Sequence, residues 1–168
     1  MQIQRTIILT HEAVLQKINR MAWQILERSH NTEHIAVVGI EKKGQVVAQM
    51  LEKSLRTICD KTIETGSIKV NKDHPNLEDI TLISEQSLTN KVVVLVDDVL
   101  NSGRTLMYAT YPILAAHPKR LITAVLANRA HANFPIKGDI VGIELATTLQ
   151  EHINFEQDKN GEMTVYLD

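Results

Sequence analysis

The sequence contains a single cysteine, Cys59, so no disulfide bond can form within the chain. Long hydrophobic runs are missing as well. The longest, Ile35–Val38 and Val92–Val96, are far shorter than the ~20 residues that a membrane-spanning helix needs. Residues 1–10 have neither a long apolar core nor a small-residue cleavage site, so we expect no signal peptide. These absences predict a cytoplasmic protein that works under reducing conditions and does not bind membranes.

The chain also has neither a large net charge nor the ligand spacing of a complete zinc site. Lys and Arg number 18 against 20 Asp and Glu, which gives a net charge of −2, and the basic residues are spread along the chain. This balance does not favour a general affinity for nucleic acid or membranes, although a local basic patch stays open. Among the seven histidines no His-x-His pair occurs and only His30 and His34 have the His-x-x-x-His spacing, and a single such pair is not enough to predict a zinc site.

What is present is the size and composition of one globular domain. The chain has 168 residues, of which 43% are hydrophobic, and we expect a single domain over residues 1–168. Strand-like and helix-like patterns alternate, which predicts an α/β fold with a central, mainly parallel sheet flanked by helices. We expect helices at about 10–28, after Gly44, and at 103–116, with strands at 3–9, 35–40, 61–70, 92–96, 121–126, 139–144 and, as an edge, 163–167.

Two features of this pattern have more than one interpretation. Residues 71–90 are polar and long for a connection, which is typical of either a functional loop or a hairpin. Trp23 has apolar neighbours in the first predicted helix, so we expect it to pack in the core or in a dimer contact.

The segment VVVLVDDVLNSGRTL, residues 92–106, places a short polar loop between a hydrophobic strand and a helix. At a helix N-terminus the backbone N–H groups lack partners and the helix dipole is positive, so a phosphate is favoured there. Gly103 lets the backbone come close to such an anion, and the hydroxyls of Ser102 and Thr105 add donors. The loop is therefore a candidate phosphate site.

Two carboxylates, Asp97 and Asp98, come where this strand is predicted to end. They cannot bind phosphate directly, but they can accept hydrogen bonds from sugar hydroxyls or hold a hydrated Mg²⁺. An isolated Asp-Asp before a turn more simply caps a helix. Acids beside a phosphate loop indicate instead a sugar phosphate with a metal ion.

A second glycine-containing segment, Gly39-Ile40-Glu41-Lys42-Lys43-Gly44, follows another predicted buried strand. It begins like a nucleotide-binding P-loop, but Gln45-Val46 stands where that motif requires Lys-Ser/Thr, so a nucleoside triphosphatase is not expected. On their own, Lys42 and Lys43 fit a solvated turn equally well.

The acidic string resembles the 5-phosphoribosyl-1-pyrophosphate (PRPP) motif of type I phosphoribosyltransferases: a hydrophobic strand, two acids and a short Ser/Thr-Gly loop. Nearly the whole chain is similar to the PyrR subgroup, whose members are pyrimidine-operon attenuators with uracil phosphoribosyltransferase activity. The matching segments are the opening Ile8-Leu9-Thr10, Val38–Gly44, Val94–Thr105 and Asn128-Arg129-Ala130-His131 with Phe134-Pro135-Ile136. The resemblance implies a Rossmann-like sheet with a small hood built from the chain ends.

The resemblance also implies a role for each matching segment. Asp97 and Asp98 would bind the ribose hydroxyls, with Asp98 assisting catalysis. The 5′-phosphate would be bound by Asn101, Ser102, Gly103, Arg104 and Thr105, and the pyrophosphate by Glu41, Lys42, Lys43 and Gly44. Lys72 would lie in a catalytic loop that closes over the site. The base would be bound by Arg129, Val141 and Ile143.

The implied activity is transfer of phosphoribose from PRPP to a nucleobase, uracil or a purine, with release of pyrophosphate. Mg²⁺ would be the cofactor, held mainly by PRPP and water with Asp97 as a further ligand, and the protein would be a homodimer or tetramer. Lys72 and Ala132 stand where the subgroup has arginine, and the segment after Val141 lacks its Pro, Ser and Lys. A PRPP- or nucleotide-sensing regulator with little catalysis, with or without RNA as a partner, is therefore the alternative.

Overall fold

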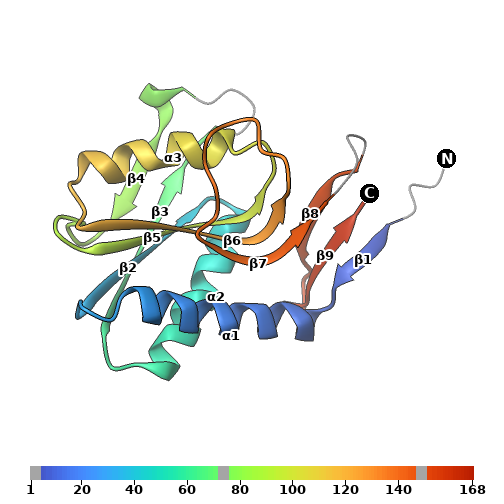
Figure 1. Ribbon diagram of the computed structural model, residues 1–168, viewed down its shortest axis with the longest axis horizontal. Coiled ribbons are helices and arrows are strands. Elements are labelled where there is room, and N and C mark those ends of the chain that lie inside the picture. Colours follow the sequence, from blue (N-terminus) through green and yellow to red (C-terminus); the bar gives the residue numbers. More distant parts are fainter. Residues whose placement is uncertain (1–4, 72–75, 147–150) are drawn as a thin grey trace.

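The computed structural model describes residues 5–71, 76–146 and 151–168. In it, strands and helices alternate in the N-terminal part of the chain and again around residues 92–129, whereas the described residues after 120 form strands without a helix (Figure 1). The strands are β1 (Thr6–Leu9), β2 (His34–Ile40), β3 (Thr62–Lys69), β4 (Thr81–Ser84), β5 (Val92–Leu100), β6 (Arg120–Arg129), β7 (Ile140–Leu145), β8 (Ile153–Gln157) and β9 (Met163–Leu167), and the helices are α1 (His11–Arg28), α2 (Lys43–Ile58), the one-turn η1 (Leu77–Asp79) and α3 (Arg104–Ala115).

The central sheet has six strands in the order β4-β3-β2-β5-β6-β7. All neighbouring pairs are parallel except β3 and β4, which confirms the predicted mainly parallel sheet. β4 shows that the polar segment after residue 76 forms a hairpin with β3, one of its two predicted alternatives.

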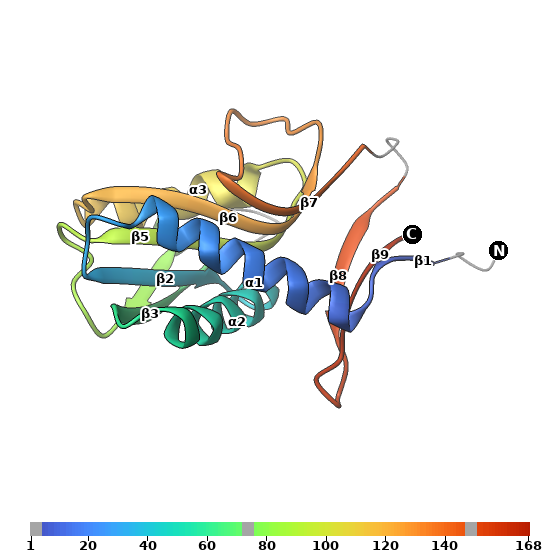
Figure 2. The same ribbon diagram turned by 60° about the horizontal axis from the view of Figure 1, so that its bottom comes forward.

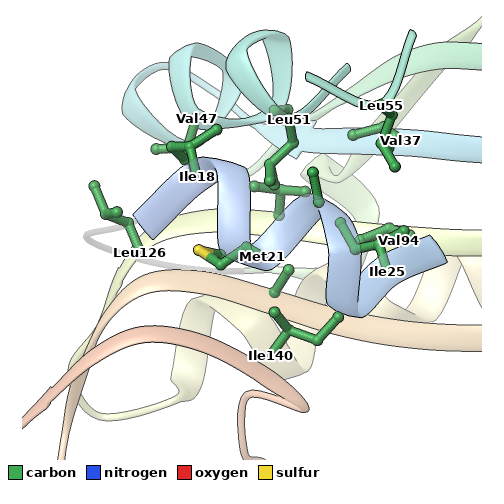
Figure 3. Packing of buried hydrophobic residues seen from close by; sticks show 14 of the residues in the cluster. Ile18, Met21, Ile25, Val37, Val47, Leu51, Leu55, Val94, Leu126 and Ile140 are labelled. Atoms are coloured by element: carbon green, nitrogen blue, oxygen red, sulfur yellow. The ribbon is translucent and has the colours of Figure 1, made fainter. Parts of the chain in front are cut away.

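Helices cover the sheet on both faces, and each face has its own hydrophobic cluster. α1 and α2 pack on one face, where Met21 and Leu51 are completely buried against strand residues such as Val94 (Figure 3). α3 packs on the other face through Leu106, Ala109 and Ile113, among others. Buried apolar residues on α1 recur every three or four positions, and Thr10 caps its first turn, as predicted.

A separate three-stranded sheet, β1-β9-β8, is built from the two chain ends and lies beside the end of the central sheet (Figures 1 and 2). It is the hood expected from the resemblance. β9 lies in its middle, so the prediction that residues 163–167 form an edge strand was wrong, because β8, which the sequence pattern did not reveal, pairs with its other side.

Trp23 is 49% exposed, so the expectation that it packs in the core of this chain was wrong. It lies on α1, whose buried stripe is made by Val14, Ile18, Met21 and Ile25. The buried stripe excludes position 23, which turns its side chain outward. Among the described residues, no helix is long and apolar enough to cross a membrane.

Candidate functional site

The candidate site lies between β2 and β5, where the order in which the chain adds strands to the central sheet changes direction. β2 and β5 are parallel neighbours, yet their crossovers leave in opposite directions. α2 follows β2 on the face covered by α1, and α3 follows β5 on the opposite face. Between such strands a crevice opens beyond the carboxyl ends, and ligands of open α/β sheets bind in it. The segments predicted as phosphate loops are the two that begin there.

The acidic pair lies inside β5 rather than after it. The strand was predicted to end at Val96, but it continues to Leu100, and Asp97 pairs with Val125 of β6. The prediction failed because pairing with a long neighbour extends a strand beyond its hydrophobic residues. Asp97 and Asp98 are only 3% and 5% exposed, and the Asp98 backbone N–H donates to Oδ1 of Asp97 at 2.9 Å. The pair is thus held on a rigid strand.

The first helix start beside this pair is that of α2. Its N-cap residue is Lys42, whose side chain makes no capping hydrogen bond, and its first turn contains no acid. The Glu41–Lys42 peptide bond is cis, and the Glu41 backbone N–H donates to the Ile68 carbonyl at 2.9 Å. Because the described residues provide no side-chain cap at this helix start, the N–H groups of its first turn can bind an external anion.

Gly44 brings this helix start against the acidic pair. A Cβ atom at this position would lie 2.9 Å from Oδ1 of Asp97 and 2.9 Å from the carbonyl oxygen of Val96. Distances that short do not occur for real side chains, so only glycine permits this approach. The segment 41–44 and Asp97 consequently lie side by side.

The second helix start, that of α3, faces the pair from the other side of the sheet. Gly103 is its N-cap with a φ of 83°, a left-handed conformation that glycine adopts readily. The N-cap residue has no side chain to cap the helix, and Oγ of Ser102 accepts from the Arg104 backbone N–H at 3.3 Å. The first turn again lacks an acid, whereas α1 has both a Thr10 cap and Glu12. A small cavity of about 90 Å³ lies over this turn, lined by Asp97, Val99, Leu100, Asn101, Ser102, Gly103, Thr105 and Leu106.

The loop between β6 and β7, residues 130–139, packs on this phosphate loop. The backbone N–H groups of Asn133 and Phe134 donate to the Ser102 carbonyl at 2.9 and 3.0 Å, and Ile136 lies next to Gly103. A larger cavity of about 660 Å³ opens beside it. Its lining includes Leu100, Asn128, Arg129, Ala130, His131, Ala132, Phe134, Pro135, Ile136, Lys137, Gly138 and Glu144.

The residues predicted for the base do not all reach this cavity. Arg129 lines it, whereas Val141 and Ile143 pack against the two hydrophobic clusters instead. Lys72, the predicted catalytic lysine, lies outside the described residues. The cavity is also lined by Asn128 and Glu144, which were not among the predicted site residues. Glu144 ends one predicted strand and Asn128 lies two residues beyond another, but only the register pairs them.

A family model described as the phosphoribosyl transferase domain matches residues 4–159, and the chain belongs to that family. It is a phosphoribosyltransferase, and the family supports phosphoribosyl transfer from PRPP. Two curated relatives, both named bifunctional protein PyrR, fit the resemblance seen in the sequence. The relative from Staphylococcus saprophyticus is 31% identical over 156 residues, 88% of this chain and 89% of its own, and that from Staphylococcus carnosus is 30% identical over 171 residues, 96% and 98%.

Solved structures share the fold at lower identity. The hypoxanthine phosphoribosyltransferase of Trypanosoma cruzi superposes with a TM-score of 0.77 at 17% identity, covering 95% of each chain. A hypoxanthine-guanine phosphoribosyltransferase from Bacillus anthracis gives a TM-score of 0.74 at 20% identity, covering 88% of this chain and 86% of that one. At these identities the likeness shows the fold, in agreement with the predicted fold class.

The close approach at Gly44 generates a prediction about stability. Gly44→Ala should lower the free energy of unfolding by about 1–3 kcal/mol, because the new methyl group overlaps Asp97 and the Val96 carbonyl. Helix propensity alone predicts that Gly44→Ala would raise the free energy of unfolding, since alanine is favoured over glycine by about 1 kcal/mol in a helix. Urea denaturation measures the difference. The control is Gln49→Ala on an exposed position of the same helix, and equal or greater stability of Gly44→Ala would contradict the tight contact.

Proposed function

We propose that the chain, acting as one domain over residues 1–168, catalyses Mg²⁺-dependent transfer of phosphoribose from PRPP to a nucleobase. One observation carries the proposal: two helix N-termini, whose N-cap residues make no side-chain cap and whose first turns contain no acid, flank a buried pair of carboxylates. PRPP has the same order of groups, with a monophosphate at one end of the ribose and a diphosphate at the other. The site therefore offers anion donors for both ends and acceptors for the sugar between them.

Each segment has a proposed role in binding. Residues 101–105 hold the 5′-phosphate through their backbone N–H groups and the hydroxyls of Ser102 and Thr105. Residues 41–44 hold the diphosphate, with the charges of Lys42 and Lys43 nearby. Asp97 and Asp98 accept hydrogen bonds from the 2′- and 3′-hydroxyls of the ribose.

The reaction is a displacement at the anomeric carbon. A ring nitrogen of the base forms the new bond to C1, the bond from C1 to the diphosphate oxygen breaks, and pyrophosphate leaves with the electron pair. Positive charge develops on the ribose, and the buried Asp98 carboxylate would stabilise it or assist loss of the ring-nitrogen proton. The lysines of residues 41–44 and Lys72 would favour the leaving diphosphate, and the rigid strand fixes the reactants in line.

The residues present fit a magnesium ion that arrives with the diphosphate. Carboxylate oxygens are suitable ligands, and Asp97 or Asp98 could provide one. Among the described residues no group of three or more His, Cys, Asp or Glu is arranged to hold a metal, so most ligands would come from PRPP and water. When bound, the ion would neutralise charge on the departing pyrophosphate.

Pyrophosphate release with PRPP, Mg²⁺ and each of uracil, hypoxanthine, guanine, xanthine and adenine tests this function. We expect release with at least one base, and its loss when Mg²⁺ is chelated. Asp98→Asn should reduce turnover at saturating PRPP by roughly 10- to 100-fold, because a hydrogen bond to a charged group is worth about 1.5–3 kcal/mol. Asp60→Asn, at an exposed position beyond the far end of α2, is the control.

Near-full turnover by Asp98→Asn would remove that residue from the mechanism. If no base gives pyrophosphate while PRPP still raises the melting temperature of the wild-type protein, the catalytic proposal fails. The regulatory alternative, a sensor of PRPP or a nucleotide for which RNA is a further candidate ligand, would then be favoured.

We place the expected homo-oligomer contact on the outer face of α3. After Arg104 this helix contains no charged residue, and Met107, Tyr111 and Leu114 are 39%, 55% and 55% exposed on one side of it. A helix that is apolar on its solvent side as well as its core side is typical of one buried by a partner, and a second copy of the chain is the partner that we propose.

Tyr111→Glu should therefore convert the oligomer to a species of 18.9 kDa, the mass of one chain, in light scattering. The position is exposed, so the fold itself should tolerate the charge. Gln49→Glu, on the exposed side of α2, should leave the oligomer intact. A wild-type monomer, or an oligomer unaffected by Tyr111→Glu, would refute this contact.

A further inference from the structure

The cavity of about 660 Å³ at the ends of β6 and β7 adjoins the proposed ribose-phosphate site. Leu100 lines both this cavity and the small one over the α3 start, and the loop 130–139 is hydrogen-bonded to Ser102. The cavity has the size of an ordinary small-molecule site. A base joined to a ribose between the two helix starts can reach it, so its polar lining decides which base fits.

Two side chains on adjacent strands form a hydrogen-bonded pair in this lining. Asn128 of β6 and Glu144 of β7 are register partners, and Nδ2 of Asn128 donates to Oε2 of Glu144 at 3.1 Å. The orientation of the amide is determined by this contact, since a flipped amide would place its oxygen against the carboxylate. Oδ1 of Asn128 is buried and has no hydrogen-bond partner among the described residues.

The pair offers a defined pattern of hydrogen bonding to a ligand. The Asn128 amide nitrogen has two hydrogens and uses one of them on Glu144. Within the described part of the chain the second hydrogen has no other recorded acceptor, so it can donate to a ligand. Glu144 is exposed, and a carboxylate presents two acceptor oxygens. From Asn128 to Glu144, the pair therefore offers a ligand one hydrogen-bond donor, the amide N–H, followed by two acceptors, the carboxylate oxygens.

The polar edges of the nucleobases differ in how they meet this pattern. Guanine presents an acceptor at O6 and donors at N1 and the 2-amino group, which is the full complement. Xanthine and uracil present acceptor, donor, acceptor, so one carbonyl oxygen would face the carboxylate. Hypoxanthine lacks the 2-amino donor, and adenine places its donor against the amide N–H groups. Only guanine meets all three positions without an unpaired or repulsive contact.

We infer that Asn128 and Glu144 read the base edge and select a 2-amino-6-oxopurine as the acceptor of phosphoribose. This inference rests on the proposed transferase function and adds the substrate class to it. Glu144 acts as the specificity residue because it alone distinguishes the 2-amino group of guanine from the 2-oxo group of xanthine. The apolar wall of the cavity, including Phe134 and Ile136, covers the ring.

Glu144→Gln tests the inference with almost no change in shape. A glutamine replaces one acceptor oxygen by an N–H donor, which opposes the 2-amino group and suits a 2-oxo group. The kcat/KM for guanine should fall roughly 10- to 100-fold, the effect of losing a charge-assisted hydrogen bond, and the ratio of guanine to xanthine should move toward xanthine. Glu162→Gln, an exposed acid in the hood, should leave both values unchanged.

Binding of the product nucleotides separates this inference from the catalytic proposal. Calorimetric titration with GMP, XMP and UMP needs no turnover, and the wild-type protein should bind GMP tightest. If pyrophosphate assays show no activity but Glu144→Gln still weakens GMP relative to XMP, base reading stands and catalysis fails. A wild-type preference for uracil, or equal use of guanine by wild type and Glu144→Gln, would overturn the base-reading role while leaving the transferase intact.

Discussion

The close contact between the start of α2 and the buried acid of β5 is the constraint on which the site depends. Gly44 allows the helix to begin against Asp97, at a distance that no other residue could occupy. This contact exists because β2 and β5 are neighbours whose crossovers leave toward opposite faces of the sheet. With α3 starting on the far side at Gly103, two positive helix ends lie on either side of two carboxylates.

The rest of the molecule makes this arrangement rigid. β5 is buried along almost its whole length and pairs with β2 up to Val96 and with β6 as far as Leu100, so Asp97 and Asp98 are held on a strand and not by a mobile loop. The outer strand β7 is held from α1, since Arg20 donates to the carbonyls of Val141 and Gly142 at 2.9 and 2.6 Å. That anchoring satisfies the edge carbonyls and fixes the strand from which Glu144 projects. α1 thus holds in place a strand that lines the cavity of about 660 Å³, although no residue of α1 lines that cavity itself.

Local chemistry could be predicted from the sequence, and relations between distant strands could not. The acidic pair, its glycine loop and the segment 41–44 were recognisable because each is a short continuous motif with its own physical use. The continuation of β5 through Asp97 to Leu100 depends on pairing with β6, and polar residues gave no hint of it. The central place of β9 depends on a partner strand with weak periodicity. Asn128 and Glu144 are 16 positions apart and become a pair only through the β6–β7 register, which the sequence does not reveal.

The central claim is that one ligand bridges the two helix starts, with its ribose over Asp97 and Asp98. Backbone amide chemical shifts in a two-dimensional NMR spectrum test it most directly. Pyrophosphate with Mg²⁺ should shift the amides of residues 42–45, ribose 5-phosphate should shift those of residues 102–105, and PRPP with Mg²⁺ should shift both sets together. If PRPP shifts only one set, or shifts neither, the two helix starts do not form a single phosphoribosyl site and the account is wrong.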